Sequence, residues 1–199
     1  MFSALIKNLK QRGELADADI DKIISVLKVR PVKKKKNVLS EGEQSNCMFF
    51  LNEGLCRYYV IDEKGNEQTI ELVAEHNWFG DAKAFLAGET AGLNIEALED
   101  SHIFSITHAD LNRFYDEIPL FERMVRKIIE QYFIKALERV KKISRSSYSA
   151  QERYKEFLKS HPKLVNRVPL VYLSSYLGIA PETLSRLRQN SAQKQPDLS

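Results

Sequence analysis

Near its C-terminus the chain reads Leu170-Val-Tyr-Leu-Ser-Ser-Tyr-Leu-Gly-Ile-Ala-Pro-Glu-Thr-Leu-Ser-Arg-Leu-Arg-Gln-Asn190. Gly178 separates two short amphipathic stretches, where a tight turn needs a residue that readily adopts a positive φ. Pro181 can begin the second stretch, because the first position of a helix needs no backbone N–H. The apolar residues that the two stretches would bury are Leu173, Leu177, Ile179, Leu184 and Leu187. We therefore predict a helix-turn-helix in this part of the chain.

Polar and basic side chains remain exposed on the second predicted helix, and such side chains can hydrogen-bond base edges or phosphates in a DNA major groove. They are Glu182, Thr183, Ser185, Arg186, Arg188 and Gln189. Basic residues also outnumber acidic residues between positions 182 and 194. The alternative is a helical hairpin that only closes a domain, and this stretch by itself leaves both interpretations open.

The composition of the 199-residue chain sets wide limits, since 43% apolar residues can build a real core in one large domain or two small ones. A net charge of +3 is too small to indicate a nucleic-acid partner without the local pattern. No apolar run is long enough to cross a membrane, and the N-terminal segment lacks a secretory signal. The only cysteines, Cys47 and Cys56, have no metal or disulfide spacing, so we expect a cytoplasmic protein without a membrane partner.

Residues 30–106 are rich in short β-type segments that are separated by turn signals. The clearest segments are Met48–Leu51, Cys56–Ile61, Gln68–Val73 and His102–Ile106. Many short strands at this spacing predict an antiparallel barrel or jelly roll. Before residue 30, apolar residues recur at helical spacing and predict one or two helices.

A helical pattern then runs without Gly or Pro from Pro119 to about Ile143, a rod of roughly 36 Å. Its apolar stripe is wider than one core face needs, so we expect two such helices to pair in a homodimer. Packing within one monomer is the alternative. Residues 144–149 break the pattern and predict a hinge.

The predicted fold class is α+β: an N-terminal β jelly roll with flanking helices, a long dimerisation helix, and a small all-α helix-turn-helix domain. The expected boundaries are residues 1–119 for the N-terminal helices and jelly roll, 120–145 for the long helix and hinge, and 146–199 for the helix-turn-helix domain.

This order of elements resembles the Crp/Fnr family of bacterial transcription regulators, and the resemblance covers almost the whole chain. The local signatures are Val38-Leu-Ser-Glu-Gly-Glu43, Phe49-Phe-Leu-Asn-Glu-Gly54, and Trp78-Phe-Gly-Asp81 followed by Ile95-Glu-Ala97. The resemblance implies a homodimer that binds a palindromic operator in double-stranded DNA, with RNA polymerase as a further candidate partner. The family's β-hairpin wing is expected to be absent, because the residues after Asn190 are few and polar.

In nucleotide-binding members of the family, backbone N–H groups, a Glu and an Arg hold the cyclic nucleotide. Here Asp81 stands in place of the Glu, and Ala91 stands in place of the Arg that binds the phosphate. Lys83 is a cation but lacks the bidentate fork of Arg. The degenerate pocket would consist of Gly80, Asp81, Ala82, Lys83, Ala91 and Gly92. Losing the bidentate contact costs about 2–5 kcal/mol, so we do not expect cyclic AMP to bind; another small effector, or none, is the expectation.

By the same resemblance, Glu182 would accept a hydrogen bond from a cytosine amino group, and Arg186 would donate to O6 and N7 of a guanine. Thr183, Ser185 and Arg188 would contact phosphates or modify specificity. An enzyme is not expected, because the four histidines are scattered and no catalytic or metal-ligand cluster is visible. We therefore expect no resident cofactor and no metal. The alternative function is a ligand-responsive module whose helical tail binds protein instead of DNA.

Overall fold

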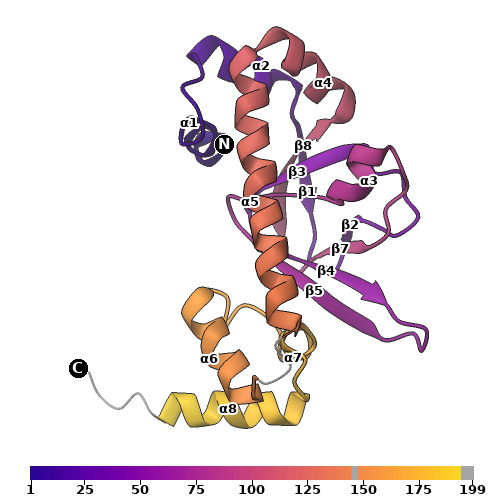
Figure 1. Cartoon of the computed structure of the whole chain (residues 1–199), viewed down its shortest axis with the longest axis vertical. Coiled ribbons are helices and arrows are strands. Elements are labelled where there is room, and N and C mark those ends of the chain that lie inside the picture. The colour runs from indigo at the N-terminus through magenta and orange to yellow at the C-terminus, as the bar shows by residue number, and fades with distance from the viewer. Residues whose placement is uncertain (145–147, 194–199) are drawn as a thin grey trace. The chain divides into compact units, whose positions relative to one another are not determined.

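The computed structural model describes residues 1–144 and 148–193. The chain divides into two compact units, one made of Met1–Tyr58 and Leu72–Ile143, the other of Tyr59–Glu71 and Ser144–Ser199. Figure 1 shows its helices α1–α8 and its β-strands, with α5 as the longest helix. Within the described part, no helix is long and apolar enough to cross a membrane.

The first unit begins with two short helices, α1 (Ser3–Lys10) and α2 (Asp17–Val26). Their apolar residues recur at helical spacing, so that one face of each helix turns inward. Leu5, Leu9 and Ile23 are completely buried. This pair confirms the helices that periodicity predicts before residue 30.

Two four-stranded sheets follow, and they form the expected β-sandwich of the jelly-roll type. One sheet has the order β1 (Lys28–Val32), β8 (Ser101–Thr107), β3 (Cys47–Glu53) and β6 (Trp78–Phe79). The other has the order β2 (Asn37–Leu39), β7 (Asn94–Ala97), β4 (Leu55–Ile61) and β5 (Glu67–Ala74). The α+β fold class is therefore confirmed.

The turn between β3 and β4 depends on Gly54, whose φ is +105°. A Cβ atom at this position would lie 2.1 Å from Oγ of Ser101, which is buried. Only glycine combines this backbone conformation with so close an approach. The sequence Asn52-Glu-Gly54 therefore marks a real turn, as its composition predicts.

The main core of this unit lies between the N-terminal helices, the sheet β1-β8-β3-β6 and three further helices. These helices are α3 (Ala82–Ala87), α4 (His108–Glu117) and α5 (Pro119–Ser144). Phe50 stacks on Phe104 with ring centroids 6.2 Å apart and meets the edge of Trp78 at 5.4 Å. The first turns of α5 close this core with Phe121 and Met124, which are 3% and 0% exposed.

The second unit contains α6 (Ala150–Ser160), α7 (Leu170–Leu177) and α8 (Pro181–Gln193). Ser149 begins α6 with a capping box, because its backbone N–H donates to Oε2 of Glu152 at 2.7 Å while its Oγ accepts from the N–H of Glu152 at 3.3 Å. Residues 145–147 of the predicted hinge lie outside the described residues. Leu173 and Leu184 form the centre of this small helical core, both fully buried.

Candidate functional site

Residues 178–180 join α7 and α8 in a short turn, which is the connection that the predicted helix-turn-helix requires. Gly178 adopts a φ of +62° and ends α7 in the left-handed conformation. The N–H of Ile179 donates to the carbonyl of Ser174 at 3.0 Å, and Arg153 of α6 donates to the carbonyl of Gly178 at 3.0 Å. Since Ser174 is small and only 3% exposed, the helices can approach each other closely at this point.

One face of α8 carries three of the predicted DNA-contacting residues. Glu182, Arg186 and Gln189 are exposed, and their spacing of four and three residues places them on the same side of the helix. Among the described residues, neither Glu182 nor Arg186 has a hydrogen-bond or ion-pair partner. Thr183 and Ser185 flank this face and are half-buried. The five side chains thus form a polar surface that is available to a partner.

Arg188, the sixth predicted contact, has a role within the protein. Its Nη2 donates to the carbonyl of Val165 at 2.8 Å and to that of Val168 at 3.3 Å. The segment between α6 and α7 is irregular, so its carbonyls need donors from elsewhere. The sequence marks this segment with His161-Pro162 and Val168-Pro169, but neither pair indicates that Arg188 would donate to it.

The residues of the predicted nucleotide pocket come together around Gly80, whose φ is +147°. A Cβ atom at Gly80 would lie 2.8 Å from Sδ of Met48, so a side chain does not fit. The hydroxyl of Tyr58 accepts from the N–H of Gly80 at 2.8 Å and donates to its carbonyl at 3.2 Å. Tyr58 was missed by sequence reasoning, because nothing in a strand pattern shows which backbone a buried hydroxyl will reach.

Asp81 uses both carboxylate oxygens inside this pocket. Oδ1 accepts from the N–H of Ala84 at 3.1 Å and caps α3, while Oδ2 accepts from the N–H of Gly92 at 2.9 Å. The side chain is buried, with 7% of the residue exposed. Two backbone donors that could hold a bound anion are therefore already occupied by a carboxylate of the chain itself.

The predicted pocket contains no cation among its described residues that is directed toward a phosphate. The Lys83 side chain is 89% exposed, and its Nζ lies 3.8 Å from a carboxylate oxygen of Glu89 at the surface. Ala91 is buried and closes the pocket with backbone hydrogen bonds to Glu43 and Gly42. Ala82 is exposed at the start of α3. The structure therefore brings Gly80, Asp81, Ala91 and Gly92 together and leaves Lys83 outside.

Arg57 is the arginine of β4, but its guanidinium is committed to an ion pair. Its Nε lies 2.6 Å from Oε2 of Glu96 on β7, and Arg57 is 1% exposed. A charge this deeply buried needs such a partner, because desolvation would otherwise cost several kcal/mol. Arg57 is therefore unavailable to replace the missing phosphate ligand.

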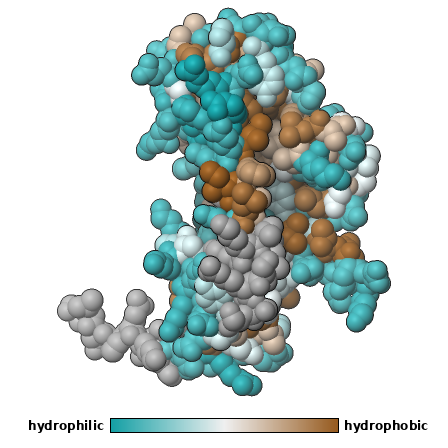
Figure 2. Space-filling view, in the orientation of Figure 1, coloured by the Kyte–Doolittle hydropathy of each residue, from teal (hydrophilic) through white to brown (hydrophobic). Residues whose placement is uncertain are grey.

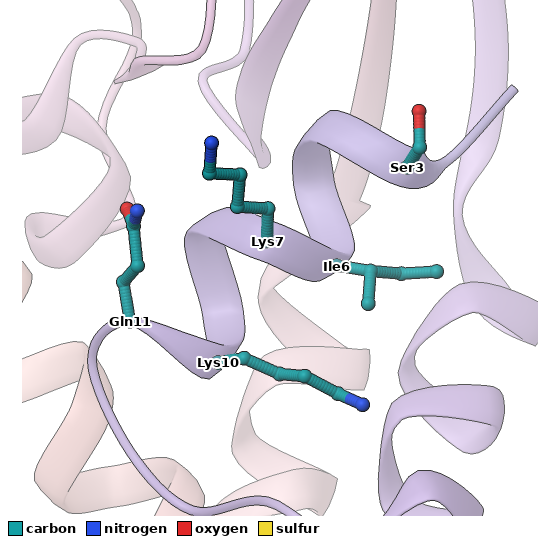
Figure 3. Close-up of a pocket in the computed structure, with 5 residues that line it drawn as sticks. All are labelled: Ser3, Ile6, Lys7, Lys10 and Gln11. Carbon is teal, nitrogen blue, oxygen red and sulfur yellow. The ribbon is translucent and has the colours of Figure 1, made fainter.

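Two further features carry no site. The hollow beside α1 is lined by a single segment, and Figure 3 shows Lys7 and Lys10 pointing in different directions rather than toward one point. Nζ of Lys10 lies 2.8 Å from Oδ1 of Asp17.

Burial raises the pKa of the Cys56 thiol to about 12 and also raises the pKa of the Cys47 thiol, so neither side chain is a reactive thiolate at neutral pH. Within residues 1–144 and 148–193, no three acidic, His or Cys side chains could hold a metal ion.

This architecture is similar to that of known proteins. A model of the cyclic nucleotide-binding domain matches residues 29–117. FixK2 from Bradyrhizobium japonicum has a similar structure, with a TM-score of 0.73 and 18% identity over 85% of this chain and 86% of that one. The c-di-GMP-responsive global regulator CLP from Xanthomonas campestris gives a TM-score of 0.71 and 14% identity over 90% and 93% of the two chains.

A transcriptional regulator of the Crp/Fnr family from Eubacterium rectale is also similar, with a TM-score of 0.68 and 17% identity over 94% of this chain and 88% of that one. No curated protein matches the sequence. These identities are too low to transfer a ligand or an operator, but the agreement in fold extends over most of each chain. Residues 29–117 therefore match the cyclic nucleotide-binding domain, and the chain shares the α+β fold of these solved regulators.

Proposed function

We propose that this chain is a sequence-specific DNA-binding transcription regulator, without catalytic activity, that acts as a homodimer on a palindromic operator. The observation that carries the proposal is the exposed face of α8 with Glu182, Arg186 and Gln189, which follows a well-formed turn. An exposed guanidinium with no partner among the described residues can donate both hydrogen bonds to O6 and N7 of a guanine. A helical hairpin that served only to close the domain would not require these side chains to remain unpaired.

Dimerisation through α5 is supported by apolar side chains that this helix leaves exposed. Ile129, Phe133 and Leu137 follow one another at intervals of four residues and are 45%, 63% and 47% exposed. In Figure 2, hydrophobic side chains gather over the middle of α5. A repeat of this kind on a long helix is typical of a surface that a second helix covers, and two copies would present two recognition helices to a two-fold symmetric site.

Cyclic AMP is not part of the proposal. The carboxylate of Asp81 accepts from both backbone donors, and its negative charge would repel a phosphate at the same place. CLP is described as responsive to c-di-GMP, but that ligand carries two phosphates and would need cations directed into the pocket, which the described residues do not supply. Regulation by a different kind of molecule, or by protein abundance alone, fits this pocket better.

Selection of bound sequences from a random pool of double-stranded DNA at about physiological salt tests the proposal. The parent chain should enrich a two-fold symmetric site. Arg186→Ala should relax the preference at one position of each half-site and weaken binding by about 1–3 kcal/mol. Arg113→Ala, which removes an exposed arginine from α4, is the matched control and should behave as the parent does. Equal selection by Arg186→Ala and the parent would refute the assigned contact, and no selection by the parent would favour a protein partner for α8.

A further inference from the structure

An apolar cavity of about 110 Å³ lies in the first unit, between the sheet β1-β8-β3-β6 and the helices α3, α4 and α5. Its deep wall includes Ile106 and Met124, which are 1% and 0% exposed. Its mouth is bordered by Leu86 and Ile129, which are 62% and 45% exposed. Of the residues of the degenerate nucleotide pocket, only Ala82 also lines this cavity, whereas Gly80, Asp81 and Gly92 do not, so the cavity lies beside that pocket and not within it.

The lining of the cavity selects for an uncharged aromatic ligand. The side chains of Phe85, Phe121 and Tyr115 offer ring faces and edges, and Met48 and Met124 offer thioethers. Aromatic rings pack favourably against both kinds of group, and methionine adapts its shape to what it contacts. No charged side chain lines the cavity, so an ionised ligand would lose its hydration without compensation.

Trp78 contributes one polar group, its indole N–H, to this apolar wall. Its indole Nε1 is buried and has no hydrogen-bond partner among the described residues, although an indole N–H can only donate. A buried donor without a partner is destabilising, and it becomes satisfied when a ligand brings an acceptor. The indole packs against Phe50 in a T-shaped arrangement, with 5.4 Å between the ring centroids.

We propose that this cavity binds an uncharged aromatic molecule of about one ring that carries a single hydrogen-bond acceptor, which pairs with the N–H of Trp78. An apolar cavity of roughly 150 Å³ in another protein stays dry and binds benzene, so the smaller cavity here, of about 110 Å³ with exposed residues at its mouth, limits the buried part of a ligand to about one ring. Ile129 belongs both to the cavity and to the exposed stripe of α5, so an occupant would change the surface that α5 presents to a second copy. This regulatory consequence rests on the proposed function, whereas the binding itself does not.

Trp78 is the only tryptophan of the chain, so its indole N–H gives a single identifiable signal in a ¹H–¹⁵N spectrum of the uniformly labelled protein. The full chain, free of DNA, is titrated with benzonitrile and separately with toluene, which is similar in size but has no acceptor. Benzonitrile should move this signal downfield in a saturable way. Toluene should bind about 2- to 10-fold more weakly and leave the signal without the downfield shift of a new hydrogen bond.

Val125→Phe fills the cavity from α5 and should abolish the saturable shift. Val29→Phe places the same change at an exposed position of β1 that does not line the cavity, and it should leave the titration unchanged. In the Trp78→Phe variant, binding is measured through the signals of the ligands. Benzonitrile and toluene should then bind with about equal affinity.

Three results would overturn the proposal: no saturable shift, a shift that Val125→Phe leaves intact, or equal affinity for both probes in the parent chain. Because no step of this experiment involves DNA, failure of the DNA-binding proposal would leave its result unaffected, and the reverse also holds.

Discussion

At the scale of single residues, one carboxylate decides how the nucleotide pocket behaves. Asp81 is one methylene shorter than the glutamate that it replaces in the family pattern, and its two oxygens reach the N–H groups of Ala84 and Gly92. The same residue therefore caps α3 and ties it to the start of β7. The charge of Asp81 stabilises the fold, whereas the family resemblance predicts that a residue at this position binds a ligand.

Asp81→Ala should consequently destabilise the first unit. Loss of a helix cap costs about 0.5–2 kcal/mol, and leaving the Gly92 N–H without an acceptor adds about 1–3 kcal/mol. Urea denaturation should show a fall in the free energy of unfolding of about 1.5–5 kcal/mol in total. Asp81→Asn keeps an acceptor oxygen and should lose less than Asp81→Ala, so equal losses would contradict this account of the side chain.

At the scale of elements, the helices of the second unit are held by contacts that lie outside the hydrophobic pattern. The capping box of Ser149 and Glu152 fixes where α6 begins. Arg188 of α8 donates to two carbonyls of the segment that leads into α7, so one side chain fixes that connection. Both contacts are internal to the second unit and fix the positions of α6 and α8.

Arg188→Ala should lower the stability of the second unit by about 1–3 kcal/mol, because two carbonyls lose a charged donor. Arg186→Ala, two residues earlier on the same helix, should leave stability within about 0.5 kcal/mol of the parent. Thermal unfolding of the two variants separates these roles. If Arg188→Ala unfolds as the parent does and only DNA affinity falls, then Arg188 is a phosphate contact and not an internal tie.

The capping box also predicts a dependence on pH. Hydrogen bonds from Ser149 lower the pKa of Glu152 below its ordinary value of 4.5, so the ionised form stabilises the folded state. This contribution is complete above the unfolded pKa and is lost as the pH falls through the lower folded pKa. Glu152→Gln keeps the cap but does not titrate, so the difference in Tm between parent and variant should shrink or reverse between about pH 5 and pH 3. A difference that stays constant over this range would exclude the carboxylate as its source.

At the scale of the whole molecule, the exposed apolar stripe of α5 is the feature that one copy of the chain leaves unexplained. Phe133 is 63% exposed in the middle of this stripe, although a large aromatic side chain gains most when it is buried. A second copy of the same helix would cover it in the proposed homodimer.

Phe133→Glu should weaken self-association by about 100-fold or more, because a central aromatic contact is lost and a charge would be buried in its place. Sedimentation equilibrium measures the effect directly. Ile61→Glu, at another exposed apolar position on β4, is the control and should leave the association constant unchanged. A parent chain that remains monomeric at every accessible concentration would refute pairing through α5.

Much of this architecture could be predicted from the sequence, because periodicity follows from which face of an element is buried. The strands of the jelly roll and the long helix after Pro119 are of this kind, and the turn at Gly178 follows from the positive φ that glycine readily adopts. The double acceptance by Asp81, the hydroxyl of Tyr58 on Gly80, and the turn of Arg188 toward Val165 were not predictable. Apart from the local cap of Asp81 on Ala84, each is a polar contact between residues farther apart in sequence, and such contacts leave no period in the chain. The separate apolar cavity was equally invisible, since its lining comes from six different elements.

The carboxylate of Asp81 occupies the backbone donors of Ala84 and Gly92, and this has a consequence for how the activity of the proposed regulator would be controlled. A tethered group competes with free ligands at an effective concentration of about millimolar or above, which does not change when the cell is diluted, starved or flooded with nucleotide. The carboxylate cannot diffuse away, be exported or be hydrolysed. In the proposed regulator, the group that occupies these two backbone donors belongs to the chain itself, so its setting would change through mutation or turnover of the protein and not through the nucleotide pool.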